Sequence, residues 1–294
     1  MKLYAPAYYK DFRCIADKCE HSCCIGWEIQ IDEETLKTYG QLEGNYARAV
    51  RESISTDGEP HFKLDACDRC PHLDERGLCK IILNLGEDRL CDICREHPRF
   101  YNFTDVAEVG IGMSCPEAAR VILSSPCYDV MEEIGETAAE ADAVEFDGRA
   151  ERRAAYALLR DERIGYRERL ERLRRDYRIP EDTDDAWLAR IASLEYLDEG
   201  HRALFLSYSS RLRPVGTEKY LERALAYFVY RHCTEAVDRE DFSDRLRFCL
   251  FCERLLASLA VYQNAETLEE IATLARIVSE EIEYSEDNTL ALME

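Results

Sequence analysis

The spacing of apolar residues predicts that the second half of this chain is helical. Tyr166, Leu170, Leu173 and Tyr177 recur at intervals of four, three and four residues, which is the periodicity of one face of an α-helix. The same periodicity predicts three further helices, whose apolar positions are Tyr220, Leu221, Ala224, Leu225, Phe228 and Val229, then Leu246, Cys249, Leu250, Leu256 and Val261, and last Leu268, Ile271, Ala275, Val278 and Ile282.

Shorter signals mark the ends of these elements and the segments between them. Thr217 and Ser243 precede apolar faces, so we expect them to be helix N-caps. Alternating or β-rich residues predict short strands at 27–31 and 106–112. The stretch 135–148 is acidic and rich in alanine, and we expect a linker or an exposed loop there.

Proline and cysteine both divide the chain near residue 127. Six of the eight prolines lie at or before Pro126, and 11 of the 14 cysteines precede Tyr128. Prolines and clustered thiols are typical of irregular, ligand-bearing loops. We therefore predict a mainly α protein with two regions: an irregular cysteine-rich metal-binding region at 1–127, packed on an α-helical region at 128–294.

The net charge of the chain argues against some classes of binding partner. The 294 residues carry a net charge of −22, with most of the excess after Cys127, and such a surface repels nucleic acid phosphates and anionic lipids. It is either an acidic surface kept for solubility or a site for a basic partner. No apolar run is long enough to span a membrane, and the N-terminus lacks a signal-peptide pattern. We expect a soluble, unprocessed cytoplasmic protein.

The cysteines before residue 128 fall into clusters. A reducing cytosol makes metal binding a better explanation for them than disulfides, and their spacing suits zinc and iron–sulfur clusters about equally. The pattern Cys-x3-Cys-x2-Cys of radical S-adenosylmethionine enzymes is absent, because Gly26 occupies its third position. The clusters are Cys14, Cys19, Cys23 and Cys24, then Cys67, Cys70, Cys79, Cys91 and Cys94, followed by the single residues Cys115 and Cys127.

The three late cysteines have a different setting. Cys249 and Cys252 lie in the apolar sequence RFCLFCERLLASL, and Cys233 follows YFVYRH. A buried free cysteine behaves as a small hydrophobic residue. We therefore expect these three thiols to belong to the helical core rather than to a metal site.

Several motifs resemble the flagellin lysine-N-methylase family (FliB). They are RCIADKCEHSCCIGWEIQID, CPHLDERGLCKIILNLGEDRLCDICREHPRF and MSCPEAAR, followed late in the chain by YLERALAYFVYRHC and SEEIEYSEDN. The resemblance touches most of the chain. The cysteine-rich chelating module also occurs in other small proteins, so the module alone does not fix the function.

The resemblance implies a cytoplasmic enzyme that transfers a methyl group from S-adenosylmethionine to lysine side chains of flagellin, and it implies a [4Fe–4S] cluster. Zinc is the alternative metal. Cys67 and Cys91 stand outside the family pattern. The metal ligands that the resemblance implies are drawn from Cys14, Cys19, Cys23, Cys24, Cys70, Cys79, Cys94 and Cys115.

Neither the methyl-donor pocket nor the base follows from a motif. No glycine-rich strand–turn–helix of the Rossmann kind is present. In the late motif the family usually carries histidine where this chain has Tyr284. The polar groups of this motif are either weak catalytic candidates or an exposed acidic helix end, and they are Glu281, Glu283, Tyr284, Ser285 and Asn288. A second candidate set, or else a part of the core, is Tyr227, Tyr230, Arg231 and His232.

Two further motifs are expected to have structural roles. Trp27 and the tract His97, Pro98, Arg99 and Phe100 are expected to pack over the metal region. Pro116 and Glu117 after Cys115 have the pattern of a helix start. The competing functional hypothesis is a non-enzymatic iron–sulfur or zinc-binding protein with an interaction or structural role.

Overall fold

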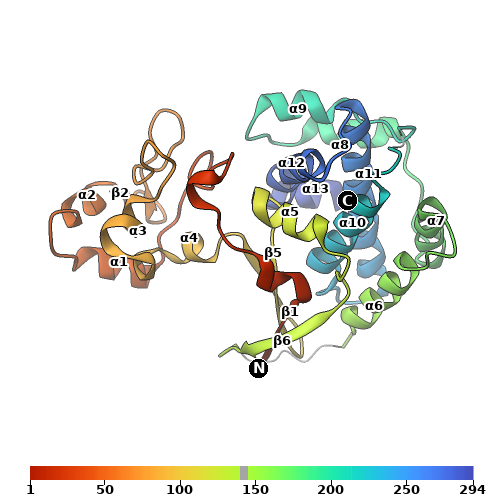
Figure 1. The fold of residues 1–294 in the computed structure, drawn as a ribbon, viewed down its shortest axis with the longest axis horizontal. Coiled ribbons are helices and arrows are strands. Elements are labelled where there is room, and N and C mark those ends of the chain that lie inside the picture. Colours follow the sequence, from red (N-terminus) through yellow and green to blue (C-terminus); the bar gives the residue numbers. More distant parts are fainter. Residues whose placement is uncertain (140–144, 213, 294) are drawn as a thin grey trace. The chain divides into compact units, whose positions relative to one another are not determined.

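The chain forms two compact units in a computed structural model that describes residues 1–139, 145–212 and 214–293 (Figure 1). The helical unit comprises Met1–Phe12 and Arg99–Glu294, and the cysteine-rich unit comprises Arg13–Pro98. The described residues contain thirteen α-helices and six short strands. The predicted mainly α class is therefore confirmed.

A four-stranded sheet explains where the chain divides. Strand β1 (Lys2–Pro6) pairs in parallel with β5 (Ala107–Ile111) and antiparallel with β6 (Met131–Glu136), and β4 (Arg99–Phe103) pairs antiparallel with β5. The strand order is β4-β5-β1-β6. Backbone hydrogen bonds therefore join β1, which precedes the cysteine-rich unit, to strands that follow it, and all four strands belong to the helical unit. The cysteine-rich unit is thus an insertion between β1 and β4, which differs from the expected division at residue 127. The strand expected at 106–112 is confirmed as β5.

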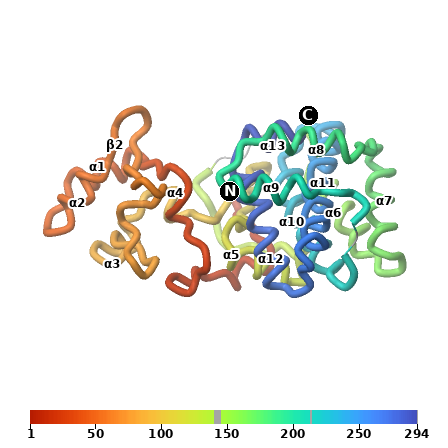
Figure 2. Tube along the Cα trace, turned by 90° about the horizontal axis from the view of Figure 1, so that it is seen from above, coloured from red at the N-terminus to blue at the C-terminus, as the bar shows by residue number. Residues whose placement is uncertain are grey.

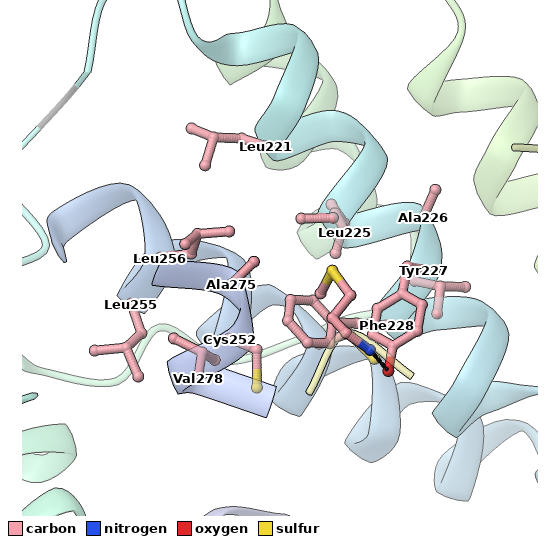
Figure 3. Close-up of a cluster of buried hydrophobic side chains, with 14 of the residues drawn as sticks. Leu221, Leu225, Ala226, Tyr227, Phe228, Cys252, Leu255, Leu256, Ala275 and Val278 are labelled. Carbon is pink, nitrogen blue, oxygen red and sulfur yellow. Dashed lines mark hydrogen bonds between the residues drawn. The ribbon is translucent and has the colours of Figure 1, made fainter. Parts of the chain in front are cut away.

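The core of the helical unit is formed mainly by four helices that the views of the chain trace show as neighbours (Figure 2). They are α5 (Pro116–Ser124), α10 (Glu218–Cys233), α11 (Arg239–Tyr262) and α12 (Leu268–Val278). Leu221 and Leu225 of α10 lie with Leu255, Leu256 and Cys252 of α11 and with Val278 of α12 in one apolar cluster (Figure 3). The remaining helices of this unit are α6 (Gly148–Leu159), α7 (Tyr166–Asp176), α8 (Asp184–Ser193), α9 (Glu199–Phe205) and α13 (Glu286–Met293).

The helices that apolar periodicity predicted are present, but one predicted end is wrong. α5 begins at Pro116 with Glu117 in its first turn, as expected. Thr217 is the N-cap of α10. Ser243 lies inside α11, because the carboxylate of Asp238 accepts a backbone hydrogen bond and starts that helix earlier.

The cysteine-rich unit consists of short elements joined by long loops (Figure 2). The strand expected at 27–31 is wrong, since only Gln30 makes a single bridge, to His61. Gly26 precedes this segment with a φ of 96°, and Asp32 ends it by capping the next helix. The elements are α1 (Glu33–Gly40), α2 (Ala47–Glu52), α3 (Lys80–Leu85), α4 (Asp92–Glu96) and the hairpin of β2 (Ile54–Ser55) with β3 (His61–Phe62).

The expected linker at 135–148 has ordered ends. Gly135 and Glu136 belong to β6 and Gly148 begins α6, whereas 140–144 lie outside the described residues. In the part of the chain that the structure describes, no helix combines the length and the apolar character that crossing a membrane requires.

Candidate functional site

Backbone pairing joins the two cysteine-bearing loops of the cysteine-rich unit. The amide of Cys70 donates to the carbonyl of Cys24 at 2.8 Å, and the amide of Gly26 donates to the carbonyl of Asp68 at 3.0 Å. An antiparallel bridge between Ile25 and Arg69 lies between them. The Cys23–Cys24 and Cys67–Cys70 segments, more than forty residues apart in sequence, are therefore held side by side.

Two helix starts position three further thiols of this unit. Cys79 is the N-cap of α3 and makes an antiparallel bridge with Leu73, which follows Cys70 closely in sequence. Cys91 is the N-cap of α4, and Cys94 lies within that helix. Since the N-terminus of a helix presents unpaired amides, these positions favour negatively charged sulfur.

Backbone amides donate hydrogen bonds to three of these sulfurs. An amide two or three residues further along the chain points to the sulfur of Cys70, of Cys79 and of Cys91. Burial raises the pKa of Cys70 to about 11 and also raises the pKa of Cys79, and these hydrogen bonds oppose the rise. They stabilise a thiolate, the form of cysteine that binds metal.

Thiol–thiol interactions link the same residues into one group. A hydrogen bond from the Cys24 thiol lowers the pKa of Cys23 to about 7, while this bond and burial raise the pKa of Cys24. A hydrogen bond from the Cys94 thiol likewise lowers the pKa of Cys91. Electrostatic interactions connect the two pairs to each other and to two more thiols. We call these six residues the thiol group: Cys23, Cys24, Cys70, Cys79, Cys91 and Cys94.

The thiol group has the donor chemistry of a metal–thiolate site. Soft sulfur ligands with amide hydrogen bonds suit zinc and iron–sulfur clusters alike. Within the described ranges, no three Cys, His, Asp or Glu side chains lie close enough together to hold a metal ion. The residues thus fit such a group by their chemistry and by their shared neighbourhood, without forming a ligand set.

The structure distributes the eight cysteines of the family pattern unevenly. Five of them belong to the thiol group, which also includes Cys91, although Cys91 stands outside that pattern. The interval Cys91-x2-Cys94 is the sequence signal that identifies it. Cys14 and Cys67 are exposed, and Cys19 lines a cleft in the same unit. Cys115 lies in the helical unit, where it caps α5 and packs against the helical core.

A small core and a histidine network support the thiol group. His72, two residues from Cys70, is buried, and its ring nitrogens lie 2.6 Å from the hydroxyl of Tyr46 and 2.8 Å from that of Ser53. The indole of Trp27 donates to the carbonyl of Cys23 at 2.9 Å, and its ring lies 5.7 Å from that of His97.

These contacts agree with the expectation that Trp27 packs against the region that carries the candidate metal ligands. Arg99 and Phe100 instead belong to the helical unit, where Arg99 donates to Tyr9 at 2.8 Å and Phe100 contacts Tyr227 and Tyr230.

The late candidate Glu283 lies in a buried network with the second candidate set. It belongs to the π-helical turn η4 (Ser279–Glu283), and its carboxylate accepts from Tyr227 at 3.0 Å and lies 2.7 Å from His232 Nε2. Burial acts to raise the pKa of Glu283, but the Arg231 guanidinium, 3.4 Å away, and the hydrogen bond and charge of His232 together hold that pKa below its usual value. The network is completed by the amide of Met113, which donates to the Tyr227 hydroxyl at 3.2 Å (Figure 3).

Glu281 is equally buried and engaged. Its carboxylate accepts from the amides of Leu197 and Asp198 at 2.8 and 3.2 Å and lies 2.6 Å from His201 Nδ1. These contacts hold the start of α9. The alternative of an exposed acidic helix end is therefore wrong for both carboxylates, because long-range contacts cover them.

Of the five late candidates only Tyr284 is substantially exposed, at 37%, and its ring packs against Arg231. Ser285 Oγ accepts from the amide of Asn288, which is itself buried and donates to the carbonyls of Glu195 and Glu281. We interpret this cluster as a structural network that joins η4 to α10, and no base is assigned in it.

The late cysteines lie in the core, as expected. Cys233, Cys249 and Cys252 are fully buried, and the sulfurs of Cys233 and Cys249 are 3.7 Å apart. Burial raises the pKa of Cys249 and of Cys252 well above the usual value. Cys249 and Cys252 therefore stay protonated, and all three side chains pack as small hydrophobic groups.

The fold and the site define a mainly α protein with an inserted cysteine-rich unit, and comparison with known proteins places it in a family. The chain is 30% identical over 129 residues to the flagellar biosynthetic protein FliU of Salmonella muenchen, which covers 41% of this chain and 76% of that protein. It therefore belongs to the family of FliU.

Two proteins named lysine-N-methylase, from Salmonella typhimurium and Salmonella choleraesuis, are also 30% identical over 129 residues. The match covers 41% of this chain and 32% of each of them, so it spans about a third of their length. No protein-family profile and no solved structure matches the chain.

Proposed function

We propose that this protein is a lysine N-methyltransferase that transfers methyl groups from S-adenosylmethionine to lysine side chains of flagellin. The observation that carries the proposal is the 30% identity to FliU, whose name refers to the flagellum, and to two proteins named lysine-N-methylase. The reaction is expected to take place in the cytoplasm, where flagellin is made.

The proposal includes a [4Fe–4S] cluster in the cysteine-rich unit, with zinc as the alternative metal. The thiol group would supply its ligands, and amides already donate to Cys70, Cys79 and Cys91. When bound, such a cluster would cross-link the loops that carry its cysteine ligands, and it would supply an electron-transfer group. Cys14, Cys19 and Cys115 remain ligand candidates through the family resemblance.

The chain must also favour loss of a proton from the substrate amine, since a free lysine ammonium has a pKa of about 10.4. Glu281 and Glu283 are already engaged by internal donors, as described above, so their carboxylates hold the fold instead of accepting this proton. We therefore expect the base that accepts the lysine proton to be an exposed carboxylate near the substrate.

The first experiment incubates anaerobically purified protein with flagellin and S-adenosylmethionine that carries a labelled methyl group. Label on flagellin lysines, located by peptide mass spectrometry, is the expected result. Iron and acid-labile sulfide in the brown protein support the cluster, whereas a colourless protein with stoichiometric zinc excludes it. Cluster-loaded protein that leaves flagellin unlabelled would contradict the methyltransferase proposal.

The second candidate function is a non-enzymatic metal-binding protein. The observation that favours it is the limited match, which covers only 32% of each lysine-N-methylase. Under this alternative, protein with a full metal content binds flagellin or another partner and transfers no methyl group. The same labelling experiment separates the two functions.

A further inference from the structure

The sequence contains two Asp-Gly dipeptides, Asp57–Gly58 and Asp147–Gly148. Glycine has no Cβ to shield its amide nitrogen, so this nitrogen can attack the side-chain carboxyl carbon of the preceding aspartate. The N–Cγ bond forms, and one carboxyl oxygen leaves as water with the amide proton and the carboxyl proton. Water then opens the five-membered ring at either carbonyl and gives aspartate or isoaspartate. The reaction needs an amide without a partner and a carboxyl group that can turn toward it.

Asp57–Gly58 lies in the loop between β2 and β3 and meets both requirements. Both residues are exposed, Gly58 has a φ of 82°, and a Cβ built on Gly58 would meet nothing within 4 Å. The amide of Asp57 donates to Ser55 Oγ at 3.3 Å. In the part of the chain that the structure describes, neither the Asp57 carboxylate nor the Gly58 amide makes a hydrogen bond or an ion pair. The two reacting groups are therefore free to meet.

Asp147–Gly148 is held at both reacting groups. The carboxylate of Asp147 caps α6, where it accepts from the amide of Ala150 at 2.9 Å and lies 3.6 Å from the guanidinium of Arg153. The amide of Gly148 donates to the carbonyl of Phe146 at 3.2 Å, and Gly148 is buried. Attack within this dipeptide therefore requires that the first turn of α6 open.

The β2–β3 hairpin connects the exposed dipeptide to the small core that supports the thiol group. Phe62 of β3 is 1% exposed, and its ring lies 4.8 Å from that of His72. The carbonyl of Pro60, in the same loop as the dipeptide, accepts from the amide of Ile31 at 2.7 Å. Isoaspartate carries the main chain through its Cβ and so adds one atom to the backbone of the loop. We expect this extra atom to disturb the strand pairing.

We propose that Asp57 isomerises spontaneously to isoaspartate, that the first turn of α6 protects Asp147 from the same reaction, and that isoaspartate at residue 57 loosens the β2–β3 hairpin. This proposal depends neither on a bound metal nor on methyl transfer. Water is the only co-reactant, so the modification accumulates with the age of the protein and not with its activity.

The test ages the full chain for weeks at physiological temperature and neutral pH, in the presence of a thiol reductant. Peptides that carry each dipeptide are separated by chromatography, and electron-transfer fragmentation distinguishes isoaspartate from aspartate of the same mass. Isoaspartate at residue 57 is expected to exceed that at residue 147 by roughly tenfold or more, because the helix cap and the first turn must open before Asp147 can react. Equal amounts at the two positions, or none at residue 57, would overturn the proposal.

Two controls separate the effect of the fold from that of the dipeptide itself. The same chain aged in urea loses the cap of α6, so residues 57 and 147 are expected to isomerise at similar rates. A preference for residue 57 that is as large in urea as in water would contradict protection by α6. Asp57→Glu keeps the charge of the loop but would have to close a less favourable six-membered ring, so its peptide should contain no isomer. An isomer that persists in this variant would overturn the assignment to Asp57.

Hydrogen exchange tests the effect on the hairpin. Because the isoaspartate peptide elutes apart from the native peptide, the deuterium uptake of both forms is measured in the same aged sample. The amides of Phe62 and Lys63 donate to the carbonyls of Ile29 and Ser53 at 3.0 and 2.8 Å, and they are expected to exchange faster in the isomerised form. Equal uptake in the two forms would contradict the loosening of the hairpin.

Discussion

Replacing Glu108 by glutamine is expected to destabilise the helical unit strongly, because it removes one charge of a buried ion pair. The carboxylate of Glu108 in β5 accepts two hydrogen bonds from Arg152 in α6, at 2.6 and 2.8 Å, and both side chains are 3% exposed. The guanidinium also donates to the hydroxyl of Thr234 at 2.6 Å and lies 4.9 Å from the ring centroid of Tyr230. The arginine is thus fixed and remains buried when its partner loses charge.

The expected loss is about 3–5 kcal/mol of unfolding free energy, which is typical for removing one partner of a buried ion pair. A matched control exists across β1, because Glu108 in β5 and Glu133 in β6 both lie opposite Tyr4 in the sheet register. Glu133 pairs with Lys2, and their side chains are 46% and 56% exposed. Glu133→Gln is therefore expected to cost far less unfolding free energy than Glu108→Gln, because solvent screens the exposed pair.

Urea denaturation followed by tryptophan fluorescence measures both losses. The chain has two tryptophans, and a Trp27→Phe background leaves only Trp187, which is buried in the helical unit and stacked on Phe251. Equal losses for Glu108→Gln and Glu133→Gln would refute the reasoning. The double variant Glu108→Leu/Arg152→Met should recover most of the stability, since no buried charge then remains.

Three further predictions test the metal site, the packing and the pH dependence. Cys79→Ser should lose the bound metal in elemental analysis and Cys249→Ser should retain it; equal losses would contradict the assignment of Cys249 to the core. Gly110→Ala should cost about 1–3 kcal/mol in thermal unfolding, because its Cβ would lie 2.3 Å from an aromatic ring carbon, whereas Gly165→Ala meets nothing within 4 Å and should be nearly neutral. Burial lowers the pKa of His232, so the unfolded chain takes up its proton first and stability should fall as the pH drops below about 6.5. A His232→Gln variant with an equally steep fall between pH 7 and 5 would refute that cause.

Local pattern was sufficient for much of the helical unit. The apolar intervals around Leu170, Leu225 and Leu256 predicted α7, α10 and α11, because a helix repeats its buried face every three or four residues. The burial of Cys249 and Cys252 followed from the same pattern. The concentration of thiols before residue 128 likewise marked the part of the chain that is proposed to bind a metal.

Contacts between distant segments decided what the sequence left open. β1 pairs with strands that begin more than 100 residues later, so the cysteine-rich unit is an insertion and not an N-terminal domain. The inclusion of Cys91 in the thiol group depends on how two loops and two helix starts meet. Glu283 resembled an exposed acid in the sequence, but contacts with Tyr227 and His232 bury it. Strand pairing and the burial of single charges arise from packing between segments that are distant in the sequence, so the local spacing of apolar residues does not predict them.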